Sequence, residues 1–265
     1  MQKTTKINKQ IKNQTVQQLF WRYAVLTLML FVQSSFGHEE THENQVDDYT
    51  ISVVTETWFP FNYFDKNQEI VGTSTDLVKA ILDHANIDYE INLYPWQRAF
   101  SYARTHKNTL IYSIFRTPLR EDLLHWICPI AKRPVHSVYK LAKRKDIKID
   151  AANDLANYTI NLTRGTFPHE FFISKGMKEG VNLQLTATND SNILMLLKNR
   201  VDLIVEAEMA IFQLIKELGL PEDTVEKVYT FDEMNQAPIC MALSKETPAY
   251  IVEKIRQSHK ALYPH

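Results

Sequence analysis

The sequence has few glycines and cysteines and few of the motifs that build common cofactor and metal sites. Its 265 residues include six glycines and two cysteines, and they contain no glycine-rich loop of the kind that cradles phosphates. They also contain no GxSxG and no metal-type cysteine spacing. One HExxH match, His38-Glu39-Glu40-Thr41-His42, lies in a polar segment with no flanking apolar pattern to hold metal ligands in a fixed geometry, and the remaining histidines give no such motif. We therefore expect no cofactor and no bound metal ion.

A basic surface for nucleic acid is also missing. The chain has 30 Lys and Arg against 31 Asp and Glu, and its first 37 residues hold five of the basic residues and none of the acidic ones. The remainder is therefore acidic overall. Because nucleic-acid binding depends on neutralising phosphates with basic side chains, we expect no nucleic-acid partner.

Residues 1–37 have the features of a secretory signal peptide. A basic start leads into an apolar run over residues 24–32 and then into Ser35-Phe36-Gly37, a small-x-small cleavage pattern. The run is about half of the ~20 residues that a membrane span needs. We expect cleavage and a soluble periplasmic product, with an uncleaved anchor as the alternative. Residues 38–48 are expected to form a flexible polar tail.

The two cysteines lie far apart in the sequence, each in an apolar, strand-like context. Cys128 and Cys240 fit two buried thiols, which is the expectation for isolated apolar cysteines. A single disulfide is the alternative, since an exported protein matures in an oxidising compartment.

Apolar strand patterns alternate with helical ones along the chain, which predicts an α/β fold with parallel sheets. The segment over residues 121–126 is expected to be short and irregular, and Ser74 or Thr75 is expected to cap the first helix. The predicted strands cover residues 51–54, 89–93, 110–115, 135–141, 158–162, 183–187, 201–205 and 237–243, and the predicted helices cover residues 76–84, 95–105, 168 onward, 192–200, 209–218 and 248–262.

Residues typical of a ligand cleft follow two of these strands. An aromatic-proline turn, Trp58-Phe59-Pro60-Phe61, comes after the first strand, and Arg116 and Arg120 come after another. Open α/β sheets bind ligands at the carboxyl ends of their strands. Two arginines at the mouth of such a pocket favour an anionic group.

A second candidate anion site lies at the start of the helix near Pro168. The loop before it contains Gly165 and Thr166. Backbone N–H groups at a helix start carry partial positive charge, and glycine lets a ligand approach the chain closely.

The ordered set of these motifs resembles the periplasmic solute-binding proteins of the type II, amino-acid-binding class, known from ABC transporters (bacterial extracellular solute-binding protein family 3). The resemblance covers nearly the whole chain after the signal peptide. It rests on the aromatic-proline turn and on Gly72-x-x-x-Asp76-Leu77, Pro95-Trp96-x-Arg98-Ala99, Arg116-Thr117-Pro118-x-Arg120-Glu121, Trp126-x-x-Pro129-Ile130, Asp154-Leu155, Arg164-Gly165-Thr166, Asn199-Arg200-Val201-Asp202 and Ser244-Lys245-x-Thr247-Pro248.

The resemblance implies a two-lobe α/β fold, the periplasmic-binding-protein type II or Venus-flytrap fold, in which two hinge segments cross between the lobes. We expect residues 49–135 and 236–265 to form the first lobe and residues 136–235 to form the second lobe with the hinge segments. We also expect a monomer that holds its ligand between the lobes.

The same resemblance assigns roles to two positive or polar groups. The family's carboxylate-binding arginine stands in a Thr-Pro-x-Arg context, which places that role on Arg120, and Thr166 matches the second-lobe contact to the same carboxylate. Arg116 either assists Arg120 or pairs with Glu121 as part of the structure.

Aromatic residues at the first turn pack against the ligand in this family, which points to Trp58 and Phe61. Trp58 is the stronger candidate, since Phe61 also fits the core. Trp96 is either a ligand contact or a packing residue between the lobes.

One position departs from the family pattern. Ala207 stands where the family's amine-binding aspartate is expected, with Glu206 and Glu208 on either side. Either acid would reach an ammonium group, although Glu208 also fits a first-turn acid of the next helix. An α-amine on the ligand is therefore in doubt.

These observations predict a non-catalytic periplasmic receptor for a small, amino-acid-like carboxylate, which delivers its ligand to an ABC permease. A solitary sensor or accessory protein is the alternative, with a membrane sensor as partner. A dehydratase-like enzyme on the same scaffold and an interaction domain with a vestigial cleft are the remaining hypotheses.

Overall fold

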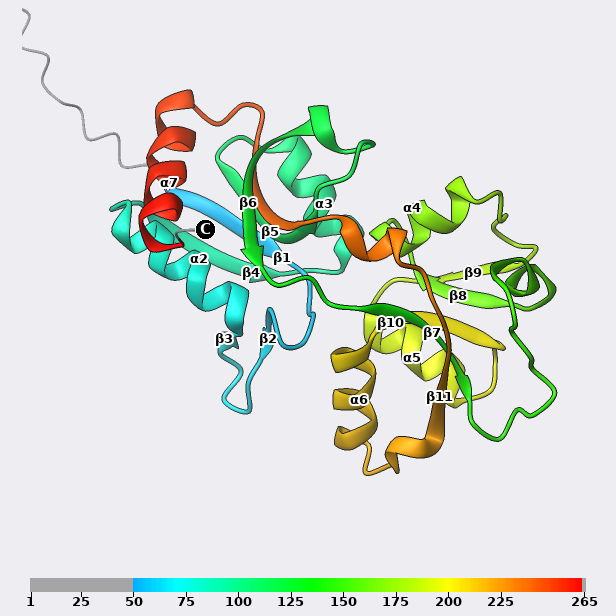
Figure 1. The fold of residues 1–265 in the computed structure, drawn as a ribbon. Coiled ribbons are helices and arrows are strands. Elements are labelled where there is room, and N and C mark those ends of the chain that lie inside the picture. Colours follow the sequence, from blue (N-terminus) through cyan, green and yellow to red (C-terminus); the bar gives the residue numbers. More distant parts are fainter. Residues whose placement is uncertain (1–49, 264–265) are drawn as a thin grey trace, which may run out of the picture. The chain divides into compact units, whose positions relative to one another are not determined.

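The computed structural model describes residues 50–263, so the predicted signal peptide and polar tail lie outside the described residues. The described part forms two five-stranded sheets, each with its own helices, and a two-stranded ribbon (Figure 1). The two-lobe α/β fold predicted from the sequence is confirmed.

Lobe 1 is built on a sheet with the strand order β4-β1-β5-β12-β6. Strand β1 pairs in parallel with β4 and β5, whereas β12 is antiparallel to β5 and β6. Its elements are β1 (Thr50–Thr55), β2 (Tyr63–Phe64), β3 (Ile70–Val71), α2 (Thr73–His84), β4 (Asp88–Leu93), α3 (Trp96–Thr105), β5 (Thr109–Phe115), β6 (Leu124–Ala131), β12 (Ile239–Ser244) and α7 (Ala249–Leu262).

Lobe 2 is built on a sheet with the strand order β11-β7-β10-β8-β9. Strands β10, β8 and β9 are parallel to one another, and β7 runs antiparallel to β10 and β11. Its elements are β7 (His136–Leu141), β8 (Ile160–Thr163), α4 (Phe167–Ser174), β9 (Leu183–Thr186), α5 (Asn189–Leu197), β10 (Leu203–Ala207), α6 (Glu208–Glu217) and β11 (Val225–Thr230).

The central strands are apolar on both faces because helices cover both sides of each sheet. Every residue of β5, β7, β8, β10 and β12 is buried. In lobe 1 one apolar cluster lies against α2 and α7, and another lies against α3. Two further clusters occupy the two faces of the lobe 2 sheet. The sheets therefore form rigid platforms whose strand ends hold the site.

Two local predictions were wrong, and one strand was missed. The segment predicted to be irregular is a short 3-10 turn followed by strand β6, which pairs with β12. Strand β11 had no prediction, because its alternation of exposed and half-buried residues gives a weak apolar pattern. Helix α2 begins before Ser74, because carbonyl groups of the aromatic turn accept the N–H groups of Thr73 and Ser74, at 3.0 Å in both cases.

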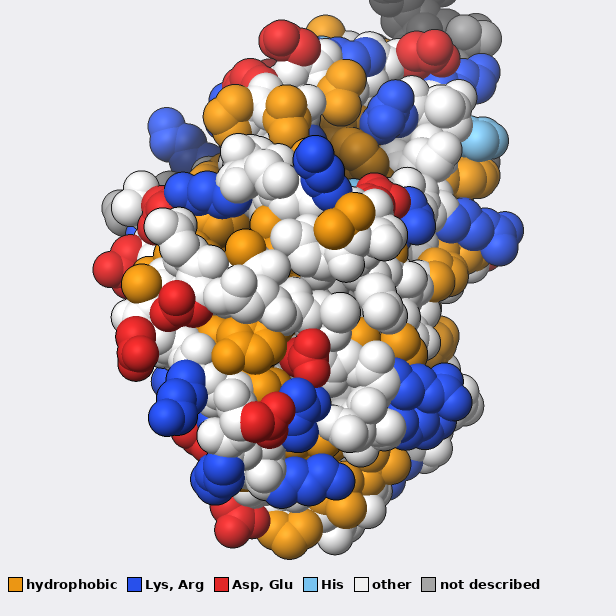
Figure 2. Space-filling model, turned by 90° about the vertical axis from the view of Figure 1, so that its right-hand side faces the viewer, with side chains coloured by type: hydrophobic (Ala, Val, Ile, Leu, Met, Phe, Trp, Pro, Cys, Tyr) orange, Lys and Arg blue, Asp and Glu red, His pale blue; other side chains and the backbone are white. Residues whose placement is uncertain are grey.

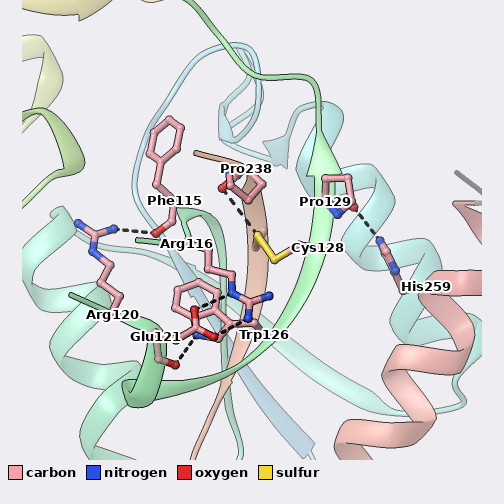
Figure 3. The surroundings of a disulfide bond; sticks show 10 residues. Phe115, Arg116, Arg120, Glu121, Trp126, Cys128, Pro129, Pro238 and His259 are labelled. Carbon is pink, nitrogen blue, oxygen red and sulfur yellow. Dashed lines mark hydrogen bonds and ion pairs between the residues drawn. A yellow bond between two sulfur atoms is a disulfide. The ribbon is translucent and has the colours of Figure 1, made fainter. Parts of the chain in front are cut away.

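A disulfide joins Cys128 of β6 to Cys240 of β12 (Figure 3). The expectation of two buried thiols was therefore wrong, since the two cysteines lie on neighbouring antiparallel strands that sequence spacing does not reveal. Residues 132–135 leave lobe 1 just after β6, and residues 231–238 return to it just before β12. The bond thus links the two lobe 1 strands that adjoin the crossing segments, β6 before the first segment and β12 after the second.

The outer surface has no strong charge asymmetry on the face that Figure 2 shows. Lys and Arg side chains there alternate with Asp and Glu, and apolar side chains are scattered between them. None of the described helices combines the length and the apolar character that crossing a bilayer requires.

The close approach of α2 to the aromatic turn predicts a strong effect of Gly72→Ala. Gly72 has φ 127°, and a Cβ there would collide with the backbone carbonyl of Phe61. We expect a loss of at least about 2 kcal/mol in the free energy of unfolding, measured by chemical denaturation. Gly180→Ala is the control, because Gly180 also has positive φ but a Cβ there meets no atom within 4 Å. Equal losses in the two variants would contradict a steric role for Gly72.

Removal of the disulfide should destabilise the protein because the bond restricts the unfolded chain. The cysteines are 112 residues apart, and such loops typically contribute about 2–5 kcal/mol. The variant Cys128→Ala/Cys240→Ala should melt roughly 5–15 °C lower in calorimetry. A reducing agent should lower the melting temperature of the wild type and leave that of the variant unchanged. A variant that melts with the oxidised wild type would show that the bond adds no stability.

Candidate functional site

A small cavity lies between the lobes at the carboxyl ends of β1, β5, β8 and β10. Its volume is about 30 Å³, enough for about two water molecules. Lobe 1 contributes Glu56, Trp58, Trp96, Ser113, Phe115 and Arg120, and the remainder of the chain contributes His136, Thr163, Thr166, Phe167, Pro168, Asn189, Val205 and Glu206. The strand ends of both sheets thus meet at one place, as expected for a binding cleft in an α/β fold.

Arg120 is the most buried charged residue of the site, with 1% of its surface exposed. Its Nε and Nη2 donate to Glu170 of α4 at 3.0 and 2.8 Å, and Nη2 also donates to the carbonyl of Gly165 at 3.0 Å. Nη1 donates to the carbonyl of Phe115 at 3.3 Å. Burial lowers the pKa of Arg120, and the Glu170 carboxylate opposes that shift. The residue predicted to take a ligand's carboxylate is therefore already paired with a carboxylate of the protein.

Trp96 strengthens the same junction. Its indole N–H donates to the Gly165 carbonyl at 2.6 Å, and its ring lies 5.0 Å from the guanidinium of Arg120. Gln97, the next residue of α3, donates to the carbonyl of Arg164 at 3.2 Å. Helix α3 of lobe 1 is thereby bonded to the loop before α4 in lobe 2.

Two buried acids face the cavity from opposite lobes. Glu56 follows β1, and burial raises its pKa to about 8, with a further increase from Glu206 and a decrease from Arg120. Glu206 ends β10, and burial raises its pKa to about 7, although hydrogen bonds from the N–H of Ala207 and the amide of Asn192 lower it. An uncharged acid is favoured at both positions, because the cavity supplies little solvation.

Ser113 is held in the cavity wall by an irregularity of β5. The pairing with β12 skips one residue here, and Ser113 has φ 57° in the left-handed region. Such a conformation costs a non-glycine residue about 1–3 kcal/mol. Its buried hydroxyl has no hydrogen-bond partner among the described residues. A strained serine with an unused hydroxyl at a cavity is the arrangement expected of a ligand contact.

His136 completes the wall where the chain enters lobe 2. Its ring lies 5.9 Å from that of Trp58 and 5.6 Å from that of Phe115. Burial lowers its pKa to about 4, so the imidazole is neutral near pH 7. It therefore adds no positive charge to the cleft.

The structure brings five of the predicted site residues to the cavity, namely Arg120, Thr166, Trp58, Trp96 and Glu206, and places Gly165 in contact with two of them. Thr166 donates its hydroxyl hydrogen bond to the carbonyl of Thr163 at 2.7 Å.

Three predicted residues lie elsewhere. Arg116 pairs with Glu121 beside Trp126 while Arg120 points away from them (Figure 3). Phe61 lies in the lobe 1 core with its ring 4.7 Å from that of Trp58. Glu208 is half exposed and lies 3.6 Å from Lys227. These placements follow the structural alternatives, namely an ion pair, a core residue and a first-turn acid.

Sequence reasoning missed Glu56, Ser113 and Glu170. Glu56 had a usable signal, because it is an acid directly after a buried strand that ends at the cleft. Ser113 had none, since its bulge depends on pairing with β12. Glu170 reads as an ordinary first-turn acid, and its contact with Arg120 joins residues 50 positions apart. The described residues include no cluster of His, Cys, Asp or Glu suited to a metal ion.

The raised pKa values predict that stability falls as the pH rises. The pKa values of Glu56 and Glu206 are higher in the folded protein than the ordinary value of 4.5, which applies to the unfolded chain. The folded protein therefore binds these protons more tightly. Their stabilising effect is therefore full below pH 4.5 and is lost as the pH passes about 7 and about 8. Between pH 6 and 9, denaturant titrations should show wild-type stability falling by up to about 4 kcal/mol relative to Glu56→Gln/Glu206→Gln.

Glu208→Gln is the matched control for this measurement, because it removes an exposed acid close to Glu206 in the sequence. Its pH profile should follow that of the wild type. If the double variant instead followed the wild type, the two buried acids would not be the groups that titrate.

Several solved structures have a fold similar to that of this chain. A histidine kinase sensor domain with similarity to periplasmic binding proteins aligns with TM-score 0.70 and 19% identity over 80% of this chain and 90% of that chain. The arginine-, lysine-, histidine-binding protein ArtJ from Geobacillus stearothermophilus aligns with TM-score 0.68 and 21% identity over 81% and 89% of the two chains.

The Salmonella typhimurium periplasmic binding protein STM4351, described for its high arginine specificity, aligns with TM-score 0.67 and 16% identity over 80% of this chain and 92% of that chain. At these identities the likeness concerns the fold. A sequence search of the curated proteins gave no match.

The sequence itself matches a family at more than half of its length. The model of the bacterial extracellular solute-binding proteins, family 3, matches residues 51–213, which cover the aromatic turn, Arg120 and both buried acids of the cavity. The resemblance inferred from the ordered motifs is confirmed, and the chain belongs to bacterial extracellular solute-binding protein family 3.

Proposed function

We propose that the protein is a periplasmic, non-catalytic receptor that captures a small solute between its lobes. The observation that carries this proposal is the cavity at the strand ends, whose wall comes from both lobes. A ligand there touches both lobes in the closed form alone, so binding favours closure over opening. A partner protein that binds the closed form then distinguishes the ligand-bound protein from the free one.

Two ligand chemistries fit the cavity. An amino-acid-like solute would place its carboxylate on Arg120 by displacing Glu170 and its ammonium group near Glu56 and Glu206. A solute without a carboxylate would leave the Arg120–Glu170 pair intact and use the acids alone. Several structural relatives are described as arginine-binding, which supports a ligand with a cationic group in either case.

Delivery to an ABC permease is the role proposed for the closed form, supported by a structural relative described as the substrate-binding protein of an amino acid ABC transporter. A sensory role is the second candidate, supported by the relative that is a histidine kinase sensor domain. The transport role and the sensory role differ in the partner that binds the closed protein. Both require that the cleft bind a solute.

A thermal-shift screen of the purified protein tests the receptor proposal. The panel contains amino acids, other carboxylates and amines. A ligand at 100 times its Kd stabilises the native state by about 2.7 kcal/mol, which corresponds to a rise of roughly 5–10 °C for this size of protein. Small-angle scattering should show that the same ligand makes the protein more compact or keeps it closed.

The location of the site is tested with matched variants. Glu206→Gln should reduce the shift, whereas Glu208→Gln should not, because Glu206 lines the cavity and Glu208 lies on the surface. The proposal would be wrong if no solute in the panel raised the melting temperature, or if every hit were insensitive to changes in the cavity.

A further inference from the structure

The cleft between the lobes holds more acids than the inner cavity alone. Two outer hollows, of about 190 and 340 Å³, share Asn189 with the inner cavity. The first also shares Glu56 with it, and Asp190 lines both outer hollows. The acids that line the three hollows are therefore Glu206, Glu56, Asp190 and, in the largest hollow, Glu217.

The positive charge of the cleft is already used. Arg120 is the sole Lys or Arg among the described residues that line the three hollows. Glu170 takes two of its donors with one carboxylate oxygen, and the other oxygen accepts from Thr117 at 3.4 Å. The pair is neutral as a whole, so although Arg120 still lowers the pKa of Glu56, its charge does not balance all the acids of the cleft.

The aromatic walls suit a positive ligand as well. Trp58 lines the inner cavity and Phe64 lines the first outer hollow, whereas the rings of Trp96 and Tyr94 already lie beside the guanidinium groups of Arg120 and Arg98. Aromatic faces attract ammonium and guanidinium groups, most strongly where water is excluded. The unused hydroxyl of Ser113 adds an acceptor for an N–H donor at the inner end.

A ligand carboxylate meets the opposite conditions. It would have to break the contacts of Arg120 with Glu170 and then lie beside the acids that face the cavity. Each acid that ionises beside a bound ammonium group would attract that group and repel a carboxylate strongly in such a dry site. The cleft therefore discriminates against a carboxylate while it accepts the amine of the same molecule.

Resting on the proposed receptor function, we propose that the ligand is an elongated organic diamine or polyamine without a carboxylate. One ammonium group lies between Glu56 and Glu206 in the inner cavity, and the second lies near Asp190 at the mouth. The internal Glu170 carboxylate occupies the place that an amino acid's carboxylate would take on Arg120.

Matched ligand pairs test this inference directly. Lysine and cadaverine, ornithine and putrescine, and arginine and agmatine differ within each pair by the α-carboxylate alone. Calorimetric titration of the purified protein should give at least about 10-fold tighter binding for the amine of the preferred pair, the factor that a lost charge-assisted contact commonly produces. Tighter binding of the amino acid in every pair would overturn the inference.

Variants of the acids locate the amine groups. Glu56→Gln should weaken amine binding by about 10-fold or more, and the more exposed Asp190→Asn by a smaller factor. Glu208→Gln, which removes an acid outside the cleft, should leave the affinity unchanged. Equal affinities for wild type and Glu56→Gln would contradict the assignment.

Glu170→Gln tests the internal carboxylate. It keeps the shape of the side chain and releases the charge of Arg120, so lysine should gain at least about 10-fold in affinity relative to cadaverine. An unchanged ratio would show that Glu170 does not set the selectivity. Binding of amino acids in preference to amines would leave the receptor proposal standing, whereas the absence of binding by any solute would remove both proposals.

Discussion

The buried guanidinium of Arg120 is the interaction on which the arrangement of the cleft depends. Its donors reach Glu170 and the Gly165 carbonyl in lobe 2 and the Phe115 carbonyl in lobe 1, and the Trp96 ring lies against it. A buried cation is tolerated when each donor is satisfied and a counter-charge is present. The same contacts that satisfy Arg120 therefore hold the lobes against each other.

The two buried acids of the cavity, unlike Arg120, are not paired with an oppositely charged side chain by a hydrogen bond among the described contacts. Glu56 and Glu206 lie in the same cavity without a cation of their own, and burial favours their protonated forms. A positive ligand would supply the missing charge and lower both pKa values, so binding would release protons near neutral pH. Cation binding and the protonation of the two acids are thus coupled. The affinity for a cationic ligand would therefore depend on the pH of the surroundings.

Most of the scaffold was predictable from the sequence, because buried parallel strands and amphipathic helices leave strong local patterns. The positions of Arg120, Trp58 and Glu206 at strand ends followed from the same patterns. The partner of Arg120 did not, since Glu170 lies 50 residues away and a first-turn acid has many uses. The Ser113 bulge and the Cys128–Cys240 bond depend on pairing with the returning strand β12, which local patterns do not encode.

The Cys128–Cys240 bond has a consequence for how the molecule comes apart. Every strand of the second sheet lies within the 112-residue interval that the bond closes, so lobe 2 is an insertion whose two ends are covalently pinned to a finished lobe 1. If lobe 2 melts, it does so as a tethered ring of limited entropy, and its loss does not pull β6 away from β12. The two ends of lobe 2 therefore stay close together even in the unfolded chain, which lowers the entropic cost of re-forming the lobe.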